Sequence, residues 1–136
     1  MTRRELFKEV NVKCLELQSK YRINCGGCCY VAAVLAELLT KYDIPYQVVY
    51  FEKWGCHYAI RVCDRYLNRD EFDKRNICNE YSANCESLYE EYYNNGCWND
   101  MYDTRHNGIV KISLTRIFDK YGKRRNRRKT KQKFSE

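Results

Sequence analysis

The spacing of hydrophobic residues predicts two helices in the first third of the chain. After a Thr-x-x-Glu capping pattern, apolar residues recur every three or four positions up to Tyr21. A second helical pattern follows Gly27 and ends by about Lys41, because the residues before Pro45 disfavour helix. We therefore expect two helices joined by the polar, glycine-bearing segment 22–27.

The next part of the chain predicts a small sheet. β-Branched and aromatic residues dominate segments 46–51, 56–62 and 66–68, and turn residues separate these segments. Strands that follow one another so closely pair with their neighbours, so the three segments predict an antiparallel meander after the second helix.

The remaining helices are expected in the C-terminal half. Residues 73–106 are rich in tyrosine and asparagine and predict one helix, over about 82–93, that wraps the domain without adding a core layer. A final amphipathic helix is expected from Gly108, with Gly122 as its C-cap.

Length and composition fit one domain. The chain has 136 residues, of which 44% are hydrophobic, enough for a modest core over residues 1–122. No apolar run approaches the roughly 18 residues that a membrane span needs, and the first residues are charged. We expect an α+β domain in a soluble, cytoplasmic protein with no membrane partner.

Positive charge is concentrated in the C-terminal tail, residues 123–136. Eight of the 25 basic residues fall within 123–133, whereas residues 1–122 carry 17 basic and 17 acidic residues. Any attraction to nucleic acid therefore belongs to this tail, which we expect to be disordered and to attract phosphate without sequence specificity. The candidate nucleic-acid-binding residues are Lys123, Arg124, Arg125, Arg127, Arg128 and Lys129.

The nine cysteines favour reduced thiols over a disulfide scaffold. Their number is odd, and no apolar signal region follows the charged start of the chain. Most of them are expected to act as small buried apolar residues, so a reactive thiol must be identified from its surroundings.

Cys28 is the cysteine whose surroundings indicate chemistry. Two glycines precede it, and it falls on the first turn of the second predicted helix. The positive end of the helix dipole and the backbone N–H groups there favour a thiolate, which lowers the pKa of the thiol and makes the sulfur a nucleophile. The same N–H groups can stabilise an oxyanion.

His57 can serve as the base for this thiol. Strand alternation puts His57 and Ala59 on one face, and the following hairpin returns Asn68 and Asp70 close to that histidine. Either side chain could hold one ring nitrogen and leave the other to accept the thiol proton. His106 has no such context and is interpreted as a surface or structural residue.

About a third of the chain resembles the core of papain-like and transglutaminase-like cysteine enzymes. Cys28-Cys29-Tyr30-Val31-Ala32 has the spacing of the transglutaminase-like nucleophile helix, which ends before a Gly-Ile-Pro turn, here Asp43-Ile44-Pro45. His57-Tyr58-Ala59 looks like the histidine strand of that family, and residues 66–70 look like the strand that follows it. Cys25-Gly26-Gly27-Cys28 resembles the papain-like nucleophile segment, in which the second cysteine attacks.

The resemblance implies both a fold and a set of roles. The fold is a nucleophile-bearing central helix packed on a small antiparallel sheet, with further helices after it. Cys28 is the implied nucleophile and His57 the base, while the third residue is Asn68 on the papain-like pattern or Asp70 on the transglutaminase-like one. Asn24 is the candidate for the upstream polar side chain that completes a papain-like oxyanion hole with the Cys28 backbone.

We therefore expect a cysteine-dependent hydrolase or acyltransferase that acts on peptide or protein amide bonds through an acyl-enzyme, with no cofactor. Peptidase, amidase, deamidase and transamidase share this half-reaction. One alternative is a non-catalytic module whose basic tail binds nucleic acid or an acidic partner. Another is a zinc-stabilised domain, because Cys25 and Cys28 form a Cys-x-x-Cys pair, although the sequence has no second close pair.

Overall fold

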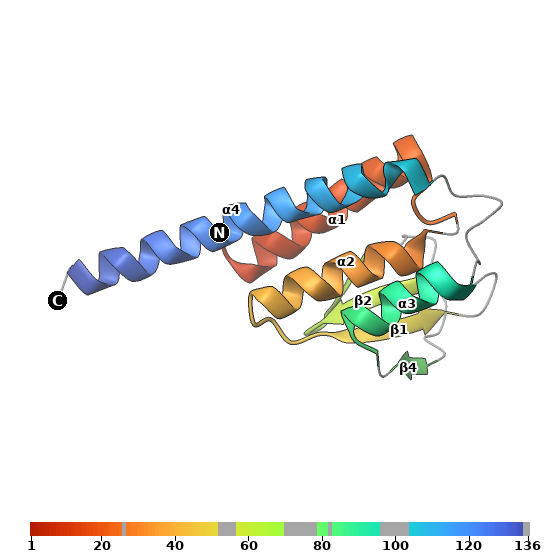
Figure 1. Cartoon of the computed structure of the whole chain (residues 1–136). Helices are drawn as coiled ribbons and strands as arrows, with labels where there is room; N and C mark the ends of the chain where they lie inside the picture. The colour runs from red at the N-terminus through yellow and green to blue at the C-terminus, as the bar shows by residue number, and fades with distance from the viewer. Residues whose placement is uncertain (26, 52–56, 70–78, 82, 96–103, 135–136) are drawn as a thin grey trace.

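The fold is a central helix enclosed between a helical pair and a small sheet. The computed structural model describes residues 1–25, 27–51, 57–69, 79–81, 83–95 and 104–134. Its elements are α1 (Arg3–Tyr21), α2 (Cys28–Lys41), β1 (Gln47–Phe51), β2 (His57–Val62), β3 (Arg65–Leu67), β4 (Asn79–Tyr81), α3 (Cys85–Asn95), the 3-10 turn η1 (Thr104–His106) and α4 (Asn107–Phe134). Figure 1 shows α1 and α4 side by side, with α2 between that pair and the sheet. The predicted α+β class is confirmed.

α2 is buried on nearly all sides. Val31, Ala33, Leu35 and Leu39 have no exposed surface, and the helix packs against β2, α3 and α4. Alanine and leucine favour helix, and a helix that is apolar all round requires partners on every side. A central helix packed on a small sheet, as the sequence predicted, is therefore present.

α2 ends in a left-handed turn. Asp43 has a φ of 55°, and the amide of Ile44 donates to the Leu39 carbonyl at 2.9 Å. This is the pattern of a Schellman C-cap, in which glycine is the usual left-handed residue because it has no Cβ. In this chain Asp43 adopts the left-handed conformation, at the position that glycine occupies in the Gly-Ile-Pro turn with which this segment was compared.

The sheet has the strand order β3-β2-β1-β4, and all its pairs are antiparallel. The predicted meander β1-β2-β3 is confirmed, with its second turn at Cys63 and Asp64. β4 was not predicted. It adds to the outer edge of β1, where Val48 pairs with Tyr81, and a three-residue strand is too short to give an alternation signal.

α3 contributes to the core. An Asn84/Ser87 pair caps its start, since Ser87 N donates to Asn84 Oδ1 at 2.9 Å and Asn84 N donates to Ser87 Oγ at 3.0 Å. Leu88 and Tyr92, one turn apart, are buried against α2. The prediction that this region adds no core layer is wrong, because its apolar face consists largely of tyrosines that resemble surface residues in sequence.

α4 continues past Gly122, so the predicted C-cap at this glycine is wrong. A Cβ at Gly122 would lie 2.5 Å from Cε1 of Tyr42, whose hydroxyl donates to Asp119 Oδ1 at 3.0 Å. The glycine therefore permits a close approach of two elements. Lysine and arginine favour helix, and the backbone from 123 to 134 extends α4 beyond the rest of the fold (Figure 1).

Within the described part of the chain, no helix combines the length and the apolar character required to cross a membrane.

Replacing Gly122 by alanine is expected to lower the free energy of unfolding by about 1–2 kcal/mol. The new methyl group overlaps the Tyr42 ring, and overpacking costs more than the helix propensity that alanine adds. Gly108→Ala in the same helix is the matched control, because no atom lies within 4 Å of its Cβ position. Urea denaturation should show Gly108→Ala unchanged or slightly stabilised, and equal effects of the two changes would contradict the packing argument.

Candidate functional site

His57 is held by the main chain of Asn68. Its Nε2 lies 2.7 Å from the Asn68 carbonyl oxygen, which can only accept, so Nε2 is the donor. In a neutral imidazole the lone pair then lies on Nδ1, the atom that can accept a proton. Both residues are buried, with 8% and 4% of their surface exposed. The interaction therefore fixes the orientation and the tautomer of the ring.

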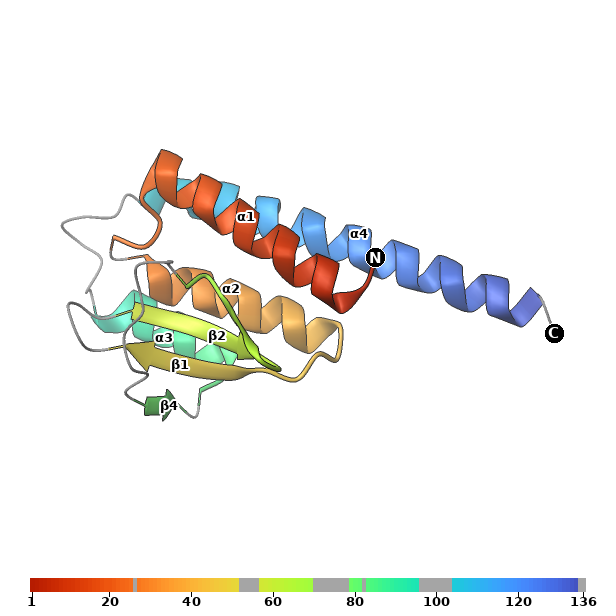
Figure 2. The same cartoon turned by 180° about the vertical axis from the view of Figure 1, so that it is seen from behind.

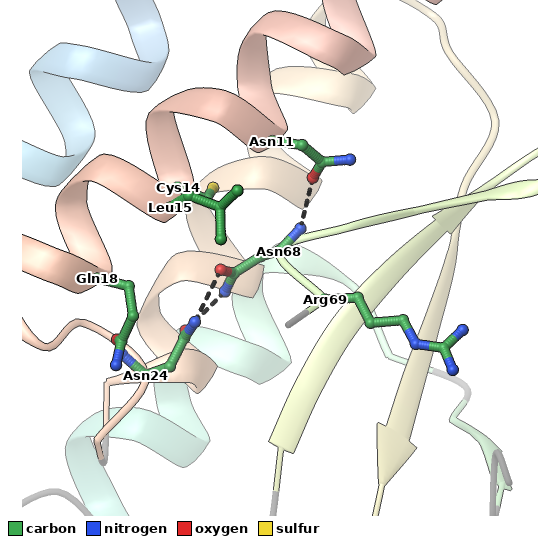
Figure 3. A pocket seen from close by; sticks show the side chains of 7 residues that line it. All are labelled: Asn11, Cys14, Leu15, Gln18, Asn24, Asn68 and Arg69. Carbon is green, nitrogen blue, oxygen red and sulfur yellow. Dashed lines mark hydrogen bonds between the residues drawn. The ribbon is translucent and has the colours of Figure 1, made fainter. Parts of the chain in front are cut away.

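The Asn68 side chain forms a reciprocal pair with Asn24 (Figure 3). Asn68 Nδ2 donates to Asn24 Oδ1 at 2.8 Å, and Asn24 Nδ2 donates to Asn68 Oδ1 at 3.0 Å. Asn68 has a φ of 59°, a left-handed conformation that asparagine tolerates better than most residues. The paired amides thus hold a strained residue whose carbonyl contacts the imidazole.

α1 supplies two further amides to this cluster. Asn68 N donates to Asn11 Oδ1 at 3.0 Å, while Asn11 Nδ2 donates to the Tyr66 carbonyl at 2.9 Å. Gln18 Oε1 accepts from the backbone N–H of Asn24 at 2.6 Å. Sequence analysis missed Asn11 and Gln18, although their seven-residue spacing places two amides on one face of α1.

A pocket of about 140 Å³ lies at this junction of α1 and the end of β3 (Figure 3). Its lining is mainly amide, with one buried thiol and one guanidinium. The lining residues are Asn11, Cys14, Leu15, Gln18, Asn24, Asn68 and Arg69.

Cys28 is the first residue of α2 and has 6% of its surface exposed. The N-cap, Gly27, makes no side-chain capping hydrogen bond, and the first turn contains no acidic residue. Within α2 itself, therefore, neither a side-chain cap nor a first-turn carboxylate offsets the positive end of the helix dipole.

Cys28 and His57 lie at the same end of the molecule. α2 packs on β2, and both elements run in the same direction, so their first residues share an end (Figures 1 and 2). The C-terminal end of α1, which leads to Asn24, is at this end as well.

The sheet separates the faces to which the two side chains belong. His57 pairs with Phe51 across β1 and β2, and their ring centroids are 6.2 Å apart. Alternation places both with Ala59 on one face, whereas Tyr58 and Ile60 on the other face pack in the core with α2. Cys28 and His57 therefore lie at one end of the layers. However, α2, which carries Cys28, packs on one face of β2, whereas the His57 side chain extends from the other face.

Four of the other described thiols have structural settings of their own. Burial raises the pKa of Cys14 to about 12, which keeps this thiol protonated. Cys29 Sγ donates to the Leu88 carbonyl at 3.2 Å, and Gln18 Nε2 donates to Cys25 Sγ at 3.8 Å. Cys63 is exposed in the turn between β2 and β3.

A cluster of tyrosines holds the start of α2 against α3 and α4. The Tyr30 ring lies 5.3 Å from that of Tyr92 and 5.8 Å from that of Tyr89, centroid to centroid. Tyr89 donates to Glu37 Oε2 at 2.8 Å, and Asn107 Nδ2 donates to the Tyr92 hydroxyl at 3.1 Å. Burial is the main cause that raises the pKa of Tyr30 to about 12.

Several sequence predictions fall outside the described residues. Asp70, the alternative third residue, is one of them, and so are Cys56, Cys78 and Cys97, which the zinc alternative could use. Among the residues that the structure does describe, no three His, Cys, Asp or Glu side chains gather as a metal site requires.

No family model, curated protein or solved structure matches this chain.

Asn68→Ala is expected to lower the free energy of unfolding by about 2–4 kcal/mol, because it removes the amide pair and leaves a Cβ in a left-handed conformation. Asn68→Gly removes the same pair but relieves the backbone, so the expected loss is about 1–2 kcal/mol. Urea denaturation measures both, and equal losses would show that the backbone strain is not significant.

Alkaline pH is expected to destabilise the fold through Tyr30. A phenol with a pKa near 12 in the folded protein and near 10 in the unfolded chain stabilises the fold fully below pH 10. That stability is lost as pH rises from 10 through 12. Tyr30→Phe should therefore lose less stability than the wild type over this range in thermal melts, and equal losses in the two proteins would contradict this role of Tyr30.

Proposed function

We propose that this protein is a cysteine-dependent hydrolase or acyltransferase of papain-like or transglutaminase-like type, with Cys28 as nucleophile and His57 as base. The observation that supports it is that Cys28 begins a buried helix with no side-chain cap at the same end as an imidazole of defined tautomer. A helix start favours a thiolate, and an imidazole with its lone pair on Nδ1 can accept the thiol proton.

The proposed reaction begins with proton transfer from Cys28 Sγ to His57 Nδ1. The thiolate then adds to the carbonyl carbon of a peptide or protein amide, and the C–N bond breaks as the imidazolium returns its proton to the leaving amine. The resulting thioester is attacked by water in a hydrolase or by an amine in a transamidase, which restores the thiol. No cofactor takes part in these steps.

The surrounding residues have distinct roles under this proposal. The backbone N–H groups at the start of α2, that of Cys28 included, stabilise the oxyanion. Asn24 acts on Asn68 through the amide pair, rather than as a donor to the oxyanion, and the Asn68 carbonyl positions His57. Asp70 remains a candidate for the acidic residue.

The His57 side chain extends from the face of β2 that does not pack on α2, and this limits where the thiol and the imidazole can meet. Because His57 shares a face with Phe51 while α2 packs on the opposite face, thiol and imidazole must meet around the N-terminal end of β2. The acyl site is thus proposed at the edge of the layers rather than between helix and sheet. The amide-lined pocket is connected to His57 through Asn68, which lines the pocket and whose carbonyl contacts the imidazole.

Alkylation by iodoacetamide, with each cysteine followed by mass spectrometry, tests the pair. Cys28 should react near pH 7 about tenfold or more faster than free cysteine, whose pKa is about 8.5. His57→Gln should remove this advantage at pH 7 while leaving the rate at pH 10 nearly unchanged, since high pH ionises the thiol without a base.

Cys29→Ser is the matched control, because Cys29 is adjacent in sequence and its thiol already donates to a carbonyl. The fast phase should persist in Cys29→Ser and disappear in Cys28→Ser. A fast phase that survives Cys28→Ser would refute the assignment of the nucleophile, and a Cys28 rate independent of His57 at pH 7 would refute the assignment of the base.

A further inference from the structure

A second groove lies at the end of the molecule opposite to Cys28. It has a volume of about 330 Å³ and lies between the first turn of α1 and the turn that joins β2 to β3. The lining residues are Arg3, Arg4, Phe7, Val62, Cys63, Asp64 and Arg65. None of them belongs to the proposed thiol site.

The groove has an apolar floor and a positively charged rim. Phe7 and Val62 are buried, whereas Arg3 and Arg4 are exposed and Arg65 is partly exposed. The lining thus contains three arginines and one acidic residue, Asp64. Among the described residues, no ion pair involves any of these three arginines. Their charge is thus available to an anionic ligand.

The basic segment of α4 leaves the body at the same end. Figures 1 and 2 show α4 running antiparallel to α1, and Lys120 Nζ lies 3.2 Å from Glu9 Oε1. The part of α4 beyond Lys120 therefore passes the first turn of α1. From there the helical backbone continues through 123–133, which contains eight basic residues and no acidic one. Two positively charged elements, one a groove and one a helix, therefore share one end.

We propose that this end binds the phosphate backbone of duplex nucleic acid, with Arg3, Arg4 and Arg65 contacting one phosphate run and the 123–134 helix lying along the duplex. The major groove of a duplex admits one α-helix, and guanidinium groups bind phosphate in a bidentate manner. This binding is independent of the thiol chemistry.

Two features favour a duplex over other polyanions. Single strands bind by stacking bases on accessible aromatic rings, but the aromatic side chain of this groove, Phe7, is 4% exposed. Stable anchoring to an anionic membrane takes a second signal beside a basic patch, such as inserted apolar side chains. The large apolar side chains that are exposed in the described part of the chain lie outside the groove lining, at Val12, Leu15, Tyr93, Ile109 and Ile112.

Fluorescence anisotropy with a labelled DNA duplex of about 24 base pairs tests the groove in the full-length chain. The triple variant Arg3→Gln, Arg4→Gln and Arg65→Gln should lower affinity about tenfold or more at roughly 0.1 M salt, and should reduce the slope of log K against log salt by about 2 to 3. Asp64→Asn should strengthen binding, because it removes the one lining carboxylate.

The matched control removes the same charge outside the groove, by Lys13→Gln, Lys20→Gln and Arg116→Gln. It should lower affinity no more than about threefold, with a nearly unchanged salt slope. Equal losses in the two triple variants would overturn the groove assignment and leave the α4 extension as a non-specific binder. Equal affinity for a single strand of the same length, or binding to phosphatidylserine vesicles but not to duplex, would overturn the choice of ligand. Cys28→Ser should bind as the wild type does, so failure here and failure of the proposed thiol chemistry are distinguishable.

Discussion

The fold depends on the burial of α2. This helix is apolar around nearly its whole circumference, and no single partner can cover such a surface. β2 covers one side, α3 another and α4 a third, while α1 closes the structure against α4 and β3. Because these partners fix both ends of the helix, the residue that begins it, Cys28, has a defined place in an otherwise apolar core.

A second constraint is the strained backbone of Asn68, whose carbonyl holds the His57 side chain in one orientation. Asn68 leaves the sheet in a left-handed conformation, which costs about 1–2 kcal/mol for a residue with a Cβ. Amides from α1 and from the segment after it satisfy both the backbone N–H and the side chain of Asn68. The carbonyl of the same residue then reaches the imidazole of His57. This partly buried polar cluster favours one geometry, because a buried amide such as that of Asn68 would cost about 1–3 kcal/mol if left without a partner.

The molecule has two chemically different ends. One gathers the start of α2, the start of β2 and the amide cluster, and it holds the groups from which acyl chemistry is proposed. The other gathers the arginines of the groove and the basic end of α4, although residues 1–122 are neutral as a whole. A neutral domain can therefore present a strongly positive end, because folding places charges of one sign together that the sequence separates by about 60 residues.

The sequence by itself determined the local elements and the candidate thiol. Periodicity gave α1, α2 and the meander, because hydrophobic spacing is a local property that the helix and strand periods impose. The same reasoning missed β4 and the core role of α3, and it ended α4 at Gly122, where the requirement comes from contact with Tyr42 rather than from the helix itself. Tertiary structure alone decided that Asn68 holds His57 through its carbonyl, that Asn11 and Gln18 complete the cluster, and that His57 and α2 take opposite faces of β2. These outcomes depend on contacts between residues as many as 57 positions apart, which local sequence patterns do not encode.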